Sequence, residues 1–162
     1  MRLYFAGPLF TQAERTWNAA IANQLVQGGH SVFLPQDEIQ SLDALEAEAI
    51  FQLDVQGVRS ADAVIAVLDG ADPDSGTCFE CGLAHALGKP IVAVRTDFRA
   101  GGDDLPGQRL PSINLMLSQA AAAIVHLPAP STTAEAVATA LLKALEGLLS
   151  RPAGADDDGV AH

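Results

Sequence analysis

Short apolar runs alternate along the chain with longer segments in which apolar residues recur every three or four positions. Apolar runs bounded by Gly or Pro are typical of strands buried on both faces of a sheet. The runs predict strands at residues 2–6, 30–34, 63–69, 90–95 and 121–127. The helical spacing predicts helices at residues 11–26, 41–59, 79–87, 112–119 and 132–149. Strands that alternate with helices in this way indicate an α/β fold.

The alternation favours a single doubly wound sheet of five parallel strands, flavodoxin-like, with the strand order 2-1-3-4-5. One domain at residues 1–149 contains all of the predicted elements. Residues 150–162 are rich in Gly and Asp without an apolar period, so we expect a disordered acidic tail. Residues 96–111 also lack a period, and a segment of this length is often a functional loop or lid.

The charge of the chain narrows its possible partners. The 162 residues have a net charge of −11, and the nine Lys and Arg residues are scattered, so we expect no nucleic-acid partner. No apolar run reaches the roughly 18 residues that cross a membrane, and the N-terminus lacks the layout of a signal peptide. We therefore expect a soluble cytoplasmic protein without a membrane partner.

Common nucleotide and metal motifs are missing from the sequence. No Gly-x-Gly-x-x-Gly follows the first strand, and no Gly-Lys-Ser/Thr loop occurs. The four His residues show no metal-ligand spacing, and Cys78 and Cys81 are too few for a zinc cage. These two cysteines do form a C-x-x-C pair, which leaves a redox role open as an alternative.

Carboxylates gather directly after the third predicted strand. Asp72 and Asp74 lie in a turn, and Glu80 lies at the start of the next helix. Ligands of open α/β sheets bind at the carboxyl ends of the strands, which places these side chains near the crevice. Thr77 is predicted as the N-cap, so that Glu80 is ionised in the first helical turn, as a nucleophile requires. The same Thr-x-x-Glu pattern is also an ordinary capping box, and both interpretations stay open.

Further polar residues are predicted at the same edge of the sheet. They are Tyr4 and Gly7 on and after the first strand, Gln36 and Asp37 after the second, and Asn114 after the long loop. Asp54 lies within a predicted helix among apolar neighbours, so its side chain can point into the crevice. Paired carboxylates are what cuts a glycosidic bond, because one attacks or stabilises the anomeric carbon while the other handles the leaving-group proton.

The order and spacing of these motifs are those of one known family. The matching segments are Tyr4-Phe-Ala-Gly-Pro-Leu-Phe10, Leu34-Pro-Gln-Asp37, Asp54, Asp74-Ser-Gly-Thr-Cys-Phe-Glu-Cys-Gly82 and Ile113-Asn-Leu-Met116. Together they resemble the nucleoside 2-deoxyribosyltransferases over about two-thirds of the chain. The resemblance implies transfer of 2-deoxyribose between the bases of free nucleosides. It also implies that the protein needs no metal or organic cofactor and forms a homo-oligomer.

The resemblance further implies a role for each residue. Glu80 corresponds to the nucleophile that forms a deoxyribosyl ester, and Asp74 to the carboxylate that exchanges a proton with the base. Asp54 corresponds to the partner acid, and Tyr4 to the phenol that hydrogen-bonds the nucleophile. Substrate binding is assigned to Gly7, Gln36, Asp37, Asn114 and Met116. In the family, the counterpart of Asn114 often reaches in from a neighbouring subunit to hold the sugar.

Two alternative functions stay open at this point. One is an N-glycosidase, in which water replaces the acceptor base, and the other is a non-catalytic module that senses nucleosides or nucleotides. The chain departs from the family pattern at Cys78 and Cys81, where the relatives have apolar residues. The loop of residues 7–11 lacks the Ser and Arg residues of a related branch that hydrolyses deoxynucleoside 5′-monophosphates, which favours free nucleosides.

Overall fold

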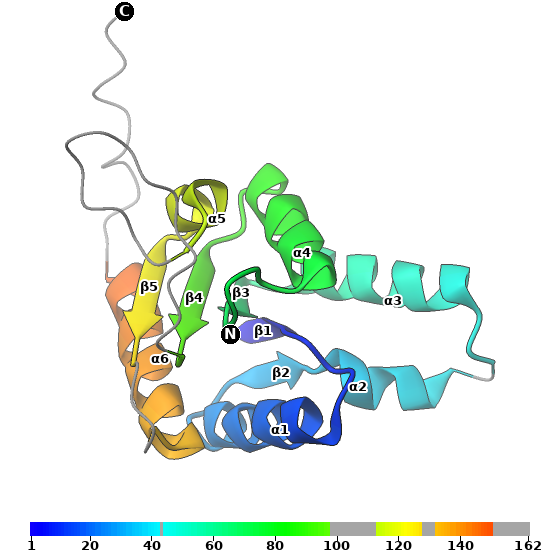
Figure 1. Cartoon of the computed structure of the whole chain (residues 1–162), viewed down its shortest axis with the longest axis horizontal. Coiled ribbons are helices and arrows are strands. Elements are labelled where there is room, and N and C mark those ends of the chain that lie inside the picture. The colour runs from blue at the N-terminus through cyan, green and yellow to red at the C-terminus, as the bar shows by residue number, and fades with distance from the viewer. Residues whose placement is uncertain (43, 98–112, 128–131, 151–162) are drawn as a thin grey trace, which may run out of the picture.

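A parallel sheet forms the centre of the protein. The computed structural model describes residues 1–42, 44–97, 113–127 and 132–150. The strands are β1 (Arg2–Ala6), β2 (Ser31–Phe33), β3 (Ala63–Val67), β4 (Ile91–Arg95) and β5 (Ala123–His126). They pair in parallel in the order β2-β1-β3-β4-β5 (Figure 1). The predicted α/β fold and its strand order are confirmed.

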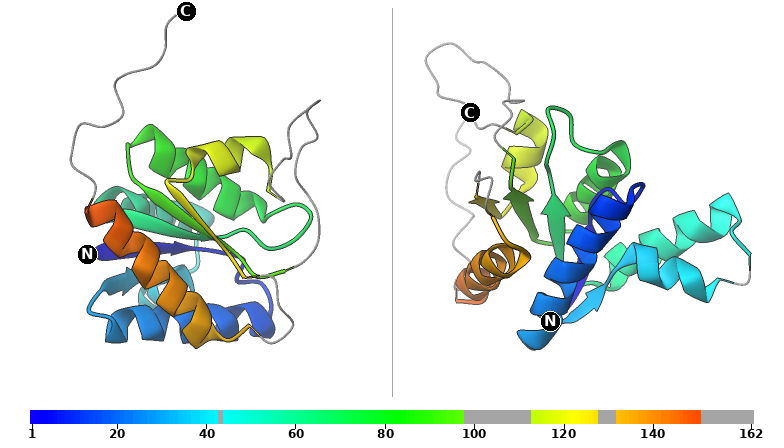
Figure 2. Two further views of the ribbon diagram at one scale, coloured as in Figure 1. Left: turned by 90° about the vertical axis from the view of Figure 1, so that its left-hand side faces the viewer. Right: turned by 60° about the horizontal axis from the view of Figure 1, so that its bottom comes forward.

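Helices cover both faces of this sheet (Figure 2). One layer consists of α1 (Gln12–Gln27) and α6 (Ala134–Leu149), and the other of α3 (Ala47–Ser60), α4 (Ser75–Ala86) and α5 (Leu115–Ala120). Residues that alternate along a strand therefore belong to two separate cores. Leu3 and Phe5 pack with α1 and α6, whereas Tyr4 and Ala6 pack on the side of α3 and α4. Burial on both faces explains why β1, β3 and β4 are continuous apolar runs in the sequence.

The connection from β2 to β3 differs from the helix predicted at residues 41–59. The short helix α2 (Pro35–Glu38) and the 3₁₀ turn η1 (Ile39–Ser41) follow β2 directly, and α3 begins later than predicted. Proline suits the first turn of a helix, because the N–H that it lacks has no partner there. Pro35 therefore starts a helix, although it also ends the strand. Figure 1 shows α2, η1 and the first turns of α3 extending away from the sheet.

Helix α4 also begins earlier than the predicted range of 79–87. It starts at Ser75, and its N-cap is Asp74, whose side chain accepts a hydrogen bond from the Thr77 backbone N–H. The prediction that Thr77 is the N-cap is therefore wrong. Glu80 lies in the second turn, beyond the free N–H groups that would stabilise its charge in the first turn. The sequence Asp74-Ser-Gly76 is typical of a turn, yet Asp is also a preferred N-cap of a helix.

Some predictions concern parts of the chain outside the described residues. The predicted lid at residues 96–111 is described only at Thr96 and Asp97, and the predicted tail at residues 150–162 only at Ser150. The extent of the domain, residues 1–149, stays a prediction. In the described parts of the chain, no helix combines the length and the apolar character that a membrane span needs.

A glycine allows α3 to approach the sheet closely. A Cβ atom at Gly57 would lie 2.7 Å from the Tyr4 ring and 2.7 Å from the Phe33 ring. These two rings stack with centroids 5.3 Å apart and an interplanar angle of 19°. Protein interiors leave no room for such an added atom unless side chains or backbone shift. Gly57 therefore sets the distance of α3 from β1, and with it the position of Asp54 one turn earlier.

We predict that Gly57→Ala destabilises the protein by about 1–3 kcal/mol, because overpacking outweighs the better helix propensity of Ala. Gly147→Ala is the matched control, since a Cβ there has no neighbour within 4 Å. That variant should gain roughly 0.5–1 kcal/mol. Urea unfolding of both variants measures the difference. Equal effects would show that the approach of α3 does not depend on Gly57.

Candidate active site

A hydrogen bond joins Tyr4 on β1 to Glu80 on α4. The Tyr4 hydroxyl donates to Oε1 of Glu80 at 2.6 Å, which is short for an O–H···O contact. Tyr4 is fully buried in β1, where its neighbours in register are Phe33 and Val64. Burial and the nearby Glu80 charge raise the pKa of Tyr4 far above its ordinary value, so the phenol keeps its proton and acts as a donor.

Burial dominates the acid–base behaviour of Glu80. It raises the pKa of this carboxyl from 4.5 to about 7. The Tyr4 hydrogen bond acts in the opposite direction, whereas the charges of Asp54 and Asp74 raise the pKa further. The charges of the neighbouring carboxylates are therefore a secondary cause of the raised pKa of Glu80. The expectation that the helix terminus keeps Glu80 charged is wrong, because the residue lies in the second turn.

Asp54 is the second carboxyl near the Tyr4 phenol. Burial raises its pKa to about 6, and the hydroxyl of Tyr4 lies close enough to lower it in part. Oδ1 of Asp54 is buried and has no hydrogen-bond partner among the described residues. A buried polar atom without a partner is costly, and ligand sites are where such atoms recur. The side chain therefore points inward, as the apolar neighbours in the sequence suggested.

Asp74, the N-cap of α4, completes the group of carboxyls. Its charge acts on Glu80, and its Oδ2 accepts hydrogen bonds from the backbone N–H and the hydroxyl of Thr77, at 2.9 and 3.1 Å. Asp72 lies nearby in the same loop and is exposed. The structure thus gathers Tyr4, Asp54, Asp74 and Glu80 from β1, α3 and the start and second turn of α4.

Gly7 and Gln36, two of the predicted substrate-binding residues after β1 and β2, each lie close to α1. Nε2 of Gln36 donates to the Arg15 carbonyl at 2.9 Å, and Oε1 of Gln36 is buried without a partner among the described residues. Gly7 lies at the end of β1, where a Cβ would come within 3.6 Å of Oδ1 of Asn18. Asp37 is exposed on α2.

Asn114 and Met116 lie at the start of α5. Asn114 is exposed, and its side-chain oxygen accepts a hydrogen bond from the Met116 N–H at 2.9 Å as a helix N-cap. Met116 is 76% exposed. Within the described parts of the chain, no hydrogen bond joins either residue to Tyr4, Asp54 or Glu80.

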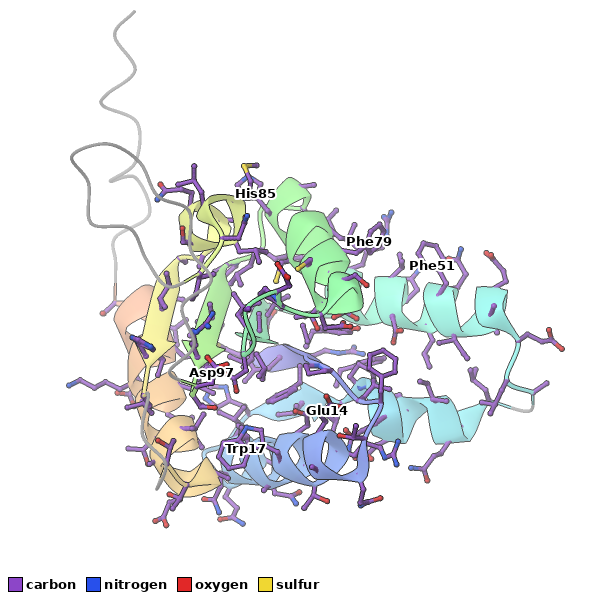
Figure 3. The ribbon with its side chains drawn as sticks, in the orientation of Figure 1. Glu14, Trp17, Phe51, Phe79, His85 and Asp97 are labelled. Atoms are coloured by element: carbon purple, nitrogen blue, oxygen red, sulfur yellow. The ribbon has the colours of Figure 1, made fainter. Side chains whose placement is uncertain are left out.

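A polar network that sequence reasoning missed holds the loop between β3 and α4. Asp69 accepts hydrogen bonds from the Thr96 N–H and hydroxyl, both at 2.6 Å. Asp97 pairs with the fully buried Arg95 at 2.9 Å and accepts from the Gly70 N–H at 2.8 Å. Figure 3 shows Asp97 at the end of β4. The only signal in the sequence was that charged residues directly follow two adjacent strands.

The cysteines beside Glu80 are free thiols. Burial raises the pKa of Cys81 to about 12, with smaller effects of Cys78 and Glu80. Burial and then the charges of Asp74 and Asp72 raise the pKa of Cys78. Redox pairs need an accessible thiolate, so these environments disfavour the redox alternative. Cys81 instead packs in the core on the α4 side of the sheet.

A family comparison covers most of the chain, including every residue of this group. The family model for nucleoside 2-deoxyribosyltransferase matches residues 3–116. The chain belongs to the nucleoside 2-deoxyribosyltransferase family. The family includes transferases and N-glycosidases, so membership fixes the type of bond but not the acceptor. A search of curated protein sequences found no match.

Solved structures share the fold of this deoxyribosyltransferase-family chain. A conserved protein from Enterococcus faecalis V583 is 28% identical with a TM-score of 0.67, covering 91% of this chain and 98% of that one. A 2-deoxyribosyltransferase from Leishmania mexicana is 25% identical with a TM-score of 0.62, covering 90% and 97%. A CMP N-glycosidase from Clostridium botulinum is 17% identical with a TM-score of 0.55, covering 90% and 98%. The last likeness shows the fold alone.

The raised pKa of Glu80 predicts a pH-dependent stability. Between about pH 4.5 and 7 the folded state binds more protons at Glu80 than the unfolded state, so this contribution to stability falls as pH rises. Glu80→Gln removes that loss and keeps an acceptor for Tyr4. On going from pH 5 to pH 8, the free energy of unfolding of Glu80→Gln should therefore rise by about 1–3 kcal/mol relative to that of the wild type.

Urea unfolding at the two pH values provides this measurement. Glu146→Gln is the matched control, since it removes one carboxyl from an exposed position on α6. That variant should keep the pH dependence of the wild type. If Glu80→Gln follows the wild type as well, Glu80 does not titrate as its burial predicts.

Proposed function

We propose that this protein transfers 2-deoxyribose between the bases of free 2′-deoxynucleosides through a covalent ester on Glu80. The observation that carries the proposal is the 2.6 Å hydrogen bond from Tyr4 to Glu80, in a site that Asp54 and Asp74 share. A phenol that stays protonated can orient one carboxylate oxygen and leave the other free to attack. Family membership supplies the class of bond, and these residues supply the chemistry.

The reaction proposed is a double displacement. An oxygen of ionised Glu80 bonds to C1′ of the sugar, and the C1′–N bond breaks with its electron pair moving to the base. The base takes up a proton from the carboxyl of Asp74. A second base then attacks C1′ from the face opposite Glu80 and returns a proton to Asp74. The bond between C1′ and Glu80 breaks, and Glu80 is released as a carboxylate. Asp54, with its pKa of about 6, can take up a further proton beside Tyr4 as the pH falls below neutral.

An N-glycosidase is the second candidate, because water can release the same Glu80 ester. The Clostridium botulinum CMP N-glycosidase has a similar fold, which is consistent with this second candidate. A sensing module without turnover is the third. The free-nucleoside preference rests on the loop of residues 7–11, which lacks the Ser and Arg expected for a 5′-phosphate.

We further infer that the protein works as a homo-oligomer. Phe51 on α3 and Phe79 on α4 are 46% and 56% exposed, and the centroids of their rings lie 6.0 Å apart (Figure 3). The two rings together form an exposed apolar surface, which is typical of an interface. Asn114 would then serve the site of a second copy.

Light scattering after size-exclusion chromatography should give at least a dimer, and Phe79→Asp should weaken this association. A monomeric wild type would contradict the inference.

A base-exchange assay tests the proposed activity. We expect the protein, given a 2′-deoxynucleoside and a different free base, to form the exchanged nucleoside, and Glu80→Ala to remain folded without turnover. Free deoxyribose without exchanged nucleoside would assign the N-glycosidase instead. Ligand binding without turnover in the wild type would assign the sensing module.

Tyr4→Phe should shift the pH profile of this activity. Removal of the hydroxyl takes away the hydrogen bond that lowers the pKa of Glu80, so the ionised nucleophile forms only at higher pH. We expect the acid limb of kcat/KM to move upward and the plateau to fall by about 10- to 100-fold, as for loss of a hydrogen bond to a charged group. An unchanged acid limb would show that Tyr4 does not tune the nucleophile.

A further inference from the structure

The two hydrogen bonds that the Asp74 side chain accepts both fall on one of its two carboxyl oxygens. Oδ2 accepts the Thr77 backbone N–H at 2.9 Å and the Thr77 hydroxyl at 3.1 Å. Thr77 is 1% exposed, so packing holds its side chain in place. A Cβ at Gly76 would lie 3.1 Å from the same oxygen. Oδ2 is therefore enclosed at the start of α4, and no hydrogen bond to Oδ1 is seen among the described residues.

The two donors decide where a proton can reside on this carboxyl. A backbone N–H can only donate, so a proton on Oδ2 would face the hydrogen of Thr77. We propose that Thr77 is a positioning residue that confines the transferable proton to Oδ1 of Asp74. This inference rests on the proposed function, in which Asp74 exchanges a proton with the base.

The same contacts act again after the proton has moved. When the C1′–N bond breaks, the proton on Oδ1 goes to the base nitrogen, and the carboxyl becomes a carboxylate. The N–H and hydroxyl of Thr77 then donate to an anion, and such charge-assisted hydrogen bonds are stronger than neutral ones. The positive end of α4 stabilises the same charge. Thr77 therefore favours the state of Asp74 that forms as the base leaves.

A leaving group that needs no proton separates this role from a structural one. The cationic base of 7-methyl-2′-deoxyguanosine leaves as a neutral molecule without taking up a proton, whereas adenine from 2′-deoxyadenosine requires one. Thr77→Val preserves the shape of the side chain and removes the hydroxyl donor. We expect kcat for 2′-deoxyadenosine to fall about tenfold or more, and kcat for 7-methyl-2′-deoxyguanosine to stay within about threefold of wild type.

Two further variants define the comparison. Thr77→Ser keeps the hydroxyl and should retain the wild-type ratio of the two rates. Asp74→Asn keeps an N-cap acceptor but cannot deliver a proton, so it should lose 2′-deoxyadenosine turnover selectively. If Thr77→Val does not fold, Thr77→Cys replaces it, because a thiol is only a weak donor.

The outcomes distinguish this inference from the proposed function. A wild type that releases no base from either substrate contradicts the proposed function itself. If Asp74→Asn is selective but the Thr77 variants lower both rates equally, Thr77 is merely structural and the inference is overturned. The inference is supported if Asp74→Asn and Thr77→Val both lose turnover of 2′-deoxyadenosine selectively while Thr77→Ser stays active.

Discussion

A partly buried hydrogen bond from the Tyr4 hydroxyl to Glu80 joins the centre of the sheet to helix α4. Its short length requires that β1 and α4 lie close together, and α3 approaches the same tyrosine. Gly57 permits the approach of α3, because any side chain there would overlap the Tyr4 and Phe33 rings. The Asp74 cap fixes where α4 begins, and so places Glu80 in the second turn. The geometry of the site thus follows from helix capping and packing.

The same packing explains the acid–base character of the site. Glu80 and Asp54 are drawn into an apolar environment, which raises their pKa values to about 7 and about 6. Carboxyls that change protonation near neutral pH suit both nucleophilic attack and proton transfer. The Tyr4 phenol opposes the rise at Glu80, so that part of the population stays ionised. Stability is lost at neutral pH to keep these groups buried, as is common where function needs perturbed groups.

Much of the fold could be predicted from the sequence, because strands buried on both faces leave continuous apolar runs. The boundaries of α3 and α4 could not, since Pro35 and Asp74 each mark a turn and a helix start equally well. The residues that meet in the site were found from their positions after predicted strands and from a family resemblance. Their pKa values could not be predicted, because burial depends on packing across distant segments. The Arg95 and Asp97 pair left no periodic signal at all.

The proposed mechanism requires that Glu80 forms a covalent bond to C1′ of a deoxyribose. Mass spectrometry tests it most directly, on protein mixed with a 2′-deoxynucleoside without acceptor base and quenched in acid. The account predicts a mass increase of one deoxyribosyl group, located on Glu80 by peptide mapping and absent in Glu80→Gln. Attachment of the sugar to any other residue, or an adduct that persists in Glu80→Gln, would contradict it.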